Sequence, residues 1–127
     1  MIDAAPLIAC EAPAVMDGDS LRCRNIGPVR LLGVDAPDYR NSRPCRERFG
    51  DHVCSDAGAR RAKASLRQGL RLGPVRLLPA GRDRYRRLLA VAYAGGTNLN
   101  CLQLRAGRVR YIARYDSNRI VSRACGL

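Results

Sequence analysis

Apolar residues occur in short runs along the first third of the chain, and turn residues separate the runs. Residues 7–16 are mostly apolar and end at Asp17-Gly18-Asp19, and Asp-Gly between two apolar runs is a hairpin signal. Residues 20–26 alternate in polarity, Gly27-Pro28 reads as a turn, and residues 29–34 form a third run. We therefore expect three strands joined by tight turns.

The middle and end of the chain carry two helix signals. Ser55 is a suitable N-cap for a helix that runs to about residue 68, with alanines and Leu66 on its inner face and Gly69 as its stop. Asn98 can cap a second helix that ends at Gly107, and a third, short helix is expected after residue 115. The chain is thus expected to hold two to three helices.

Two more strands and one long loop complete the prediction. Residues 75–78 and 87–93 read as strands separated by a turn at 81–84, whereas residues 39–53 are polar, lack periodicity and read as a loop. Five short strands with helices predict an α+β, β-rich fold built on a five-stranded barrel. At 127 residues, we expect one domain over residues 1–127.

The charge of the chain indicates its binding partner rather than its fold. Lys and Arg number 23 against 11 acidic residues, which gives a net charge of +12, and Lys63 is the single lysine. Arginine forks suit phosphate, so nucleic acid is the first expected partner and an anionic membrane the second. A GC-rich genome also favours arginine over lysine, but it does not explain the net charge. The chain shows neither an apolar run long enough to span a membrane nor a signal-peptide pattern.

The chain has six cysteines, which bear on whether the protein works in an oxidising or a reducing compartment. The chain has no Cys-x-x-Cys pair and His52 is its single histidine, which argues against a closed zinc site. An even number of spaced cysteines favours three disulfides and an oxidising compartment; the alternative is buried free thiols. Sequence alone does not choose among the pairings, but position along the chain suggests Cys45–Cys54 around the polar loop, Cys10–Cys23 on the first hairpin, and Cys101–Cys125 by exclusion.

Acidic residues cluster at two predicted strand ends. Asp17 and Asp19 lie in the first turn, and Asp35 and Asp38 follow the third strand, so adjacent strands would bring them to one end of the sheet. Crowded carboxylates are typical of a site for a hard divalent cation or for a neighbouring arginine. Each acid taken alone is also explained as an ordinary turn residue.

Three segments resemble a known family. Val-Met-Asp-Gly-Asp-Ser (15–20), Val-Arg-Leu-Leu-Gly-Val-Asp-Ala-Pro-Asp (29–38) and Asp-Arg-Tyr-Arg-Arg-Leu-Leu-Ala (83–90) resemble, in order and spacing, the signature blocks of the staphylococcal nuclease, or thermonuclease, family. Asn98-Leu99-Asn100 and Gly107 are similar to the family's later helix and its end. The resemblance spans residues 14–115, most of the chain.

The resemblance implies an OB-fold barrel and Ca²⁺-dependent hydrolysis of DNA and RNA. It assigns Asp19 and Asp35 as direct calcium ligands, the backbone carbonyl of Ala36 as a third ligand and Asp17 as a nearby outer carboxylate. Arg30 and Arg87 match the two arginines that stabilise the phosphate charge, and Asp38 stands where the family has a glutamate proposed as general base. The residues expected near substrate phosphates are Arg84, Tyr85, and one of Tyr111 and Tyr115.

Two positions depart from the family pattern. Asp38 is one methylene shorter than the usual glutamate, and a misplacement of ~1 Å can cost ~100-fold in rate. Arg86 replaces a usual glycine, and it is strained if that glycine has a positive φ. Reduced activity is therefore expected. The cysteines are similar to those of exported relatives in other bacteria.

Taken together, these features predict a monomeric, disulfide-bonded nuclease that is exported to the bacterial periplasm or secreted, uses Ca²⁺, takes DNA and RNA as substrates and has no membrane partner. A second hypothesis is an OB-fold module that binds nucleic acid without cutting it; the low aromatic content weakens it, because stacking platforms need aromatics. A third is a cationic protein that acts on anionic membranes or partner proteins, which the alanine-rich face of the first helix disfavours. Cleavage with Ca²⁺ that EGTA abolishes distinguishes these readings.

Overall fold

The predicted meander forms one half of the main sheet. In the computed structural model, which describes residues 6–47 and 52–127, strands β2 (Ala14–Asp17), β3 (Ser20–Cys23) and β4 (Gly27–Leu31) are antiparallel neighbours in that order. The prediction of a turn at Gly27-Pro28 was wrong, because these residues begin β4 and the turn occupies residues 24–26.

The predicted first strand is split in two. Its first part, β1 (Ile8–Ala9), leaves the meander and pairs with β6, while only residues from Ala14 onward continue as β2. Between them Ala12 has a φ of 46°, and Pro13 has no backbone N–H to donate. The chain therefore cannot continue as one ladder across this point.

Strands β6 (Val75–Arg82) and β7 (Leu88–Ala94) form the other half of the sheet. β7 lies parallel to β4 and antiparallel to β6 and β8 (Thr97–Asn98), which gives the order β1-β6-β7-β4-β3-β2 with β8 attached to β7. Strand β5 (Val34–Asp35) pairs with β9 (Arg110–Tyr111) in a separate ladder. The α+β class is confirmed and the arrangement is consistent with an OB-like fold, but among the described residues the strands form two sheets rather than one closed five-stranded barrel.

Both helix caps form as expected. The Ser55 hydroxyl accepts a hydrogen bond from the Gly58 backbone at 3.0 Å and begins α2 (Asp56–Leu70), and the Asn98 side chain accepts from Cys101 and begins α3 (Leu99–Arg105). The expected stop at Gly69 was wrong. Gly69 lies inside α2, where a Cβ would approach the Leu99 side chain to 2.9 Å, so the glycine permits close packing of α2 on α3.

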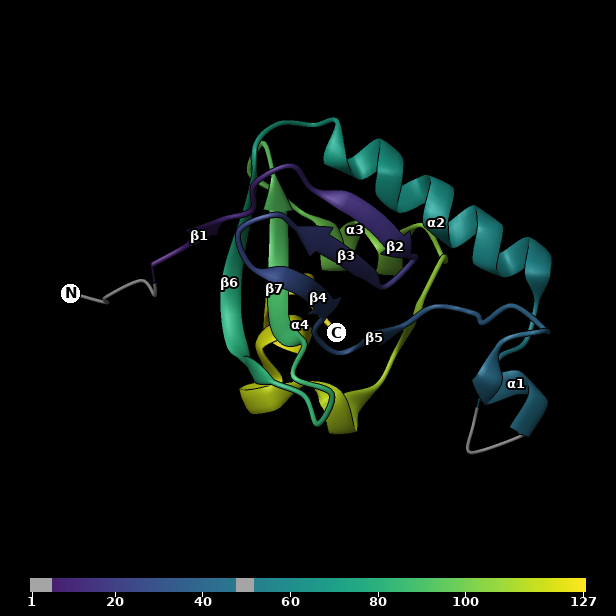
Figure 1. The fold of residues 1–127 in the computed structure, drawn as a ribbon. Helices are drawn as coiled ribbons and strands as arrows, with labels where there is room; N and C mark the ends of the chain where they lie inside the picture. The colour runs from purple at the N-terminus through teal and green to yellow at the C-terminus, as the bar shows by residue number, and fades with distance from the viewer. Residues whose placement is uncertain (1–5, 48–51) are drawn as a thin grey trace.

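Short helices occupy the remaining connections. The predicted loop 39–53 contains α1 (Arg43–Glu47), and residues 48–51 of that loop lie outside the described residues. After β9 the chain forms two 3₁₀ turns, η1 (Ala113–Tyr115) and η2 (Ser117–Arg119), and then α4 (Ile120–Cys125). Figure 1 shows α2 lying along one side of the sheet, over the β2–β3 hairpin, with α1 at the end of the molecule where α2 begins.

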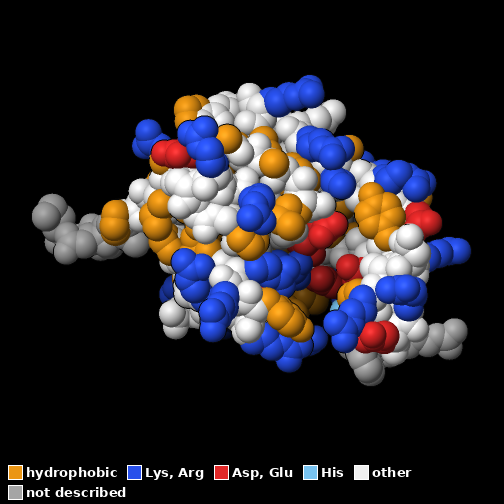
Figure 2. All heavy atoms as spheres, viewed as in Figure 1, with side chains coloured by type: hydrophobic (Ala, Val, Ile, Leu, Met, Phe, Trp, Pro, Cys, Tyr) orange, Lys and Arg blue, Asp and Glu red, His pale blue; other side chains and the backbone are white. Residues whose placement is uncertain are grey.

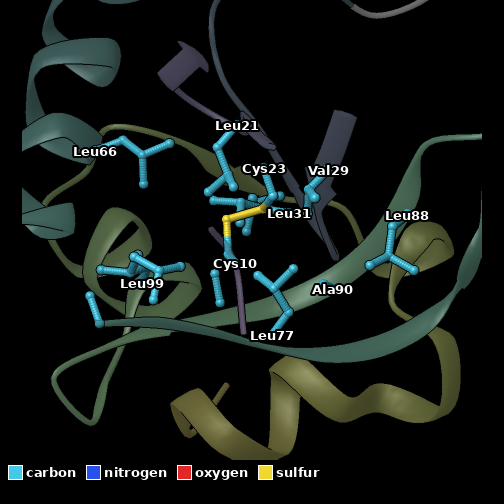
Figure 3. Packing of buried hydrophobic residues seen from close by; sticks show 14 of the residues in the cluster. Cys10, Leu21, Cys23, Val29, Leu31, Leu66, Leu77, Leu88, Ala90 and Leu99 are labelled. Atoms are coloured by element: carbon cyan, nitrogen blue, oxygen red, sulfur yellow. A yellow bond between two sulfur atoms is a disulfide. The ribbon is translucent and has the colours of Figure 1, made fainter. Parts of the chain in front are cut away.

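The core lies on both sides of β7. Ala90 and Ala92 face the larger cluster with Leu21, Leu31, Leu77 and Leu99, while Val91 faces a smaller cluster beneath α4. This explains why β7 is apolar throughout instead of alternating. Figure 3 shows the Cys10–Cys23 disulfide within the larger cluster, among leucines such as Leu21 and Leu31.

All six cysteines form disulfides, in the three pairs that chain position suggests. Besides Cys10–Cys23, the bond Cys45–Cys54 joins α1 to the segment before α2, and Cys101–Cys125 joins α3 to α4. The disulfides therefore tie the N-terminal strands, the loop after β5 and the C-terminal helix to the rest of the fold.

Candidate functional site

The two acidic turns lie at one end of the sheet. Ser20 is paired with Arg30 across β3 and β4, and the backbone N–H of Leu31 donates to the Asp19 carbonyl at 2.8 Å. This register brings the turn between β2 and β3 next to the chain that leaves β4 and enters β5. Asp19 therefore meets Asp35 because of strand pairing.

Arg30 binds both acidic turns at once. Its guanidinium forms an ion pair with Asp19 through Nη1, and its Nη2 lies 3.1 Å from Oδ1 of Asp35. The same Nη2 donates to the Val34 carbonyl at 3.0 Å, and Asp19 also accepts the backbone N–H of Ala36 at 2.8 Å. Burial alone would lower the pKa of Arg30, but Asp19 and Asp35 raise it, so the guanidinium stays charged.

Two further carboxylates lie near this ion pair. Burial raises the pKa of Asp17, and the negative charge of Asp19 raises it further, with Lys63 acting in the opposite direction. The pKa of Asp38 is raised by burial and then by the charge of Asp35, with His52 acting in the opposite direction. The carboxylates thus repel one another, and a positive charge among them is favoured.

Asp38 is held by the segment that the Cys45–Cys54 disulfide anchors. Its backbone N–H donates to the Val53 carbonyl at 2.8 Å, and its carbonyl accepts from Ser55 at 2.9 Å. Nδ1 of His52 lies 3.4 Å from Oδ2 of Asp38, and each side chain is about one-third exposed. The backbone of Asp38 is therefore fixed on both sides, while its carboxyl group still faces solvent.

Arg87 belongs to a second group, in the turn between β6 and β7. Its Nε lies 2.7 Å from Oδ2 of Asp83, whose Oδ1 accepts the backbone N–H groups of Tyr85 and Arg87. Burial opposes ionisation of Asp83, but these hydrogen bonds and the guanidinium lower its pKa below the ordinary value. The guanidinium carbons of Arg84 and Arg87 lie 5.1 and 5.5 Å from the Tyr85 ring centre, so one exposed tyrosine is flanked by two arginines.

Arg86 adopts the left-handed conformation that its position demands. Its φ is 67°, its N–H donates to the Asp83 carbonyl at 3.0 Å, and its own carbonyl accepts from Arg82 at 3.0 Å. These bonds fix the backbone, so the arginine bears a conformational cost that a glycine would not.

Tyr111 and Tyr115 lie in a third group after α3. Tyr111 is opposite Val34 in the β5–β9 pair, and its hydroxyl donates to Oδ2 of Asp116 at 2.7 Å. Tyr115 is half exposed, with the Arg114 guanidinium 4.8 Å from its ring centre. The hydroxyl of Tyr111 is thus bound by Asp116, whereas Tyr115 is half exposed.

The donor set near Arg30 suits a hard cation. Asp19, Asp35 and the carbonyl of Ala36 are all oxygen donors, the kind that Ca²⁺ prefers. Repulsion between the carboxylates adds to burial in raising the pKa of Asp17 and of Asp38, and a bound cation would relieve that repulsion. Within residues 6–47 and 52–127, no three His, Cys, Asp or Glu side chains converge as a ready-made metal cage, so backbone carbonyls and water would have to complete the coordination.

The acidic group stands out on a basic surface. Figure 2 shows acidic side chains gathered at a hollow in the face that carries the β2–β3 hairpin and β5, with Lys and Arg side chains on either side. In a chain of net charge +12, such a hollow suits a ligand that brings both negative charge and a cation. None of the described helices is long and apolar enough to cross a bilayer.

Three residues near the site were not foreseen from the sequence. Arg110 reaches Oδ2 of Asp35 at 3.3 Å, but it is one arginine among many and nothing distinguishes it. His52 had a usable signal, because it is the single histidine and lies two residues before Cys54 in a loop predicted to follow the site. Asp83 also had one, because it precedes Arg87 by four residues across a tight turn.

Comparison with known proteins agrees with this geometry. The family described as staphylococcal nuclease homologue matches residues 28–123. A protein of Haemophilus influenzae described as an uncharacterized endonuclease is 29% identical over 119 residues, which cover 91% of this chain and 58% of that protein. The chain therefore spans less than two-thirds of the relative's length. Since the family match includes Arg30, Asp35, Asp38 and Arg87 and most of the 127 residues, the chain belongs to the staphylococcal nuclease family.

Proposed function

We propose that this chain is a Ca²⁺-dependent nuclease that hydrolyses phosphodiester bonds of DNA and RNA with little sequence specificity. The observation that carries the proposal is the binding of Arg30 to both Asp19 and Asp35, beside Asp38, in a chain of this family. The name of the Haemophilus influenzae relative, an endonuclease, agrees with it.

The substrate class follows from charge. A net charge of +12 favours binding to the phosphate backbone, which all DNA and RNA sequences share. Phosphate contacts position a nucleic acid without reading its bases, so low sequence specificity is expected. Arg84 and Tyr85, which stack on each other in an exposed turn, would contact phosphates beside the cleaved one, and we assign the same role to Tyr115 or Tyr111.

The residues that would hold Ca²⁺ are Asp19, Asp35 and the Ala36 carbonyl, with Asp17 as an outer carboxylate. When bound, the ion would polarise a phosphoryl oxygen and so make phosphorus easier to attack. Asp19 and Asp35, which pair with Arg30 in the free protein, would then pair with that ion as well. Arg30 would then be able to direct N–H groups toward the phosphate.

Asp38 would act as the general base. Its side chain is partly exposed, so water reaches it, and its backbone is held on both sides by hydrogen bonds to Val53 and Ser55. The attacking water would lose its proton to Asp38 as its oxygen bonds to phosphorus. The bond between phosphorus and the ester oxygen would break on the opposite side, and that oxygen would take a proton from solvent water. Arg30 and Arg87 would donate to the phosphoryl oxygens as negative charge develops.

The disulfides support an exported protein. Three disulfides in one chain of this size are typical of oxidising compartments. We therefore propose that the protein works in the bacterial periplasm or outside the cell. We further propose that it does so as a single-domain monomer.

The test is cleavage of plasmid DNA, single-stranded DNA and RNA with Ca²⁺ and with EGTA. We expect cleavage of all three with Ca²⁺ and none with EGTA. Asp19→Ala should abolish Ca²⁺-dependent cleavage, whereas Glu11→Ala, which removes an exposed carboxylate paired with Arg24 on another part of the surface, should keep it. Binding of DNA without cleavage at any Ca²⁺ concentration would support the binding-module hypothesis instead, and full activity of Asp19→Ala would refute the site assignment.

A further inference from the structure

A buried glutamine on α3 reaches the turn that carries two site carboxylates. Gln103 is fully buried, and its Nε2 donates to the carbonyl of Gly18 at 2.8 Å and to the carbonyl of Ala62 at 2.9 Å. Gly18 separates Asp17 from Asp19, and Ala62 lies in α2. One side-chain amide therefore joins the acidic turn to two helices that are distant in sequence.

The turn is packed closely against α2. A Cβ at Gly18 would lie 2.3 Å from the Cβ of Ala62 and 3.1 Å from the Cβ of Ala36. Gly18 does not have a positive φ, so glycine is required at this position for steric reasons. The peptide between the two carboxylates thus fits between α2 and the residue whose carbonyl is assigned to the cation.

Core packing alone does not explain an amide at this position. Two carbonyl acceptors fix its orientation, because a flipped amide would place Oε1 against them. Oε1 then has no hydrogen-bond partner among the described residues, and a buried acceptor without a partner lowers stability. A methionine of similar volume would fill the space without that cost. The amide therefore acts through the two carbonyls that it binds.

We propose that Gln103 is a positioning residue for the cation site. By holding the Gly18 carbonyl against α2, it fixes the carboxylates of Asp17 and Asp19 relative to Ala36. The inference rests on the proposed function. Residues that orient ligands without touching the metal typically change its affinity by about 10–100-fold when replaced. Gln103→Met should therefore raise the Kd for Ca²⁺ by about tenfold or more.

The measurement is calorimetric titration of the full chain with Ca²⁺ alone, with folding checked by circular dichroism. Asn100 provides the matched control, because it is a second fully buried amide on α3. It binds the Leu32 carbonyl at 3.0 Å, the Ala92 backbone N–H at 3.0 Å and the Ala90 carbonyl at 3.4 Å, and none of these residues is next in sequence to a residue assigned to the cation, as Gly18 is. Asn100→Leu should lower stability and leave the Kd for Ca²⁺ within about twofold of the wild-type value. In cleavage assays, Gln103→Met should need more Ca²⁺ for half-maximal rate while its rate at saturating Ca²⁺ is nearly unchanged.

Gly18→Ala tests the same geometry with Gln103 intact. Its methyl group would push the turn away from Ala62 and weaken Ca²⁺ binding, and adding Ala62→Gly should recover part of the loss. If Gln103→Met fails to fold, Gly18→Ala still tests whether the position of the acidic turn sets the Ca²⁺ affinity. Wild-type Ca²⁺ affinity in a folded Gln103→Met or Gly18→Ala protein would overturn this inference alone. A wild-type protein that neither binds Ca²⁺ nor cuts nucleic acid would overturn the proposed function, and this inference with it.

Discussion

Replacing Arg86 by glycine should stabilise the protein, although it removes a charged side chain at an exposed position. Arg86 has a φ of 67°, and a left-handed conformation costs a residue with a side chain roughly 1–2 kcal/mol. Glycine avoids that cost but loses roughly 0.5–1 kcal/mol through its greater freedom in the unfolded chain. The difference predicts that Arg86→Gly raises the free energy of unfolding by about 0.5–1 kcal/mol, or Tm by roughly 2–4 °C.

The hydrogen bonds of this turn should survive the substitution. Arg86 takes part through its backbone alone, by donating to Asp83 and accepting from Arg82, and glycine offers the same groups. Arg86→Ala is the matched control, because it loses the same charge and keeps the same strained backbone. Its stability should stay within about 0.5 kcal/mol of the wild type.

Urea unfolding followed by circular dichroism, with the disulfides intact, measures both variants. Arg86→Gly should be more stable than Arg86→Ala, because only the glycine adopts a positive φ without strain. If the two variants unfold at the same urea concentration, the strain attributed to Arg86 is refuted, and the positive φ has no measurable cost in this turn.

Three further predictions concern the base, the loop disulfide and acid stability. Asp38→Glu should raise the cleavage rate, by up to roughly 100-fold if the shorter carboxylate is misplaced by ~1 Å, and a strongly impaired variant would show that the surrounding segment suits aspartate. Replacing Cys45 and Cys54 together by serine should lower the free energy of unfolding by about 2–3 kcal/mol and slow cleavage, because Asp38 pairs with the backbone beside Cys54; unchanged unfolding and cleavage rate would contradict this. Burial opposes ionisation of Asp116, but three hydrogen bonds to its carboxylate lower its pKa. The carboxylate therefore stabilises the fold above the unfolded pKa of about 3.9, and this stabilisation is lost as the pH falls through the folded pKa. Asp116→Asn should therefore be less stable at pH 7 and lose less stability between about pH 5 and pH 2, and equal pH dependence of urea unfolding would exclude Asp116 as the cause.

Local patterns predicted much of the fold. The caps at Ser55 and Asn98, the meander of β2 to β4 and the apolar strand β7 depend on neighbouring residues, so their signals are contained in short windows of sequence. The order of the three motif blocks likewise indicated the family that the comparison shows.

Only the tertiary structure decided how distant segments meet. The pairing of β1 with β6 and of β5 with β9 joins residues more than sixty positions apart, and two-residue strands carry no periodicity that predicts them. Gly69 looked like a helix end because its conformational preference is local, whereas its actual role depends on Leu99 from another helix.

The same division applies to the site. The sequence by itself identified the acidic turns and the two arginines as candidates, because residue type and spacing suffice for that. It did not determine that Arg30 binds both Asp19 and Asp35, that His52 lies beside Asp38, or that Gln103 holds the acidic turn. These contacts depend on strand register and helix packing, so only the fold shows which residues are partners. The chemistry that each residue can perform was already evident from the sequence.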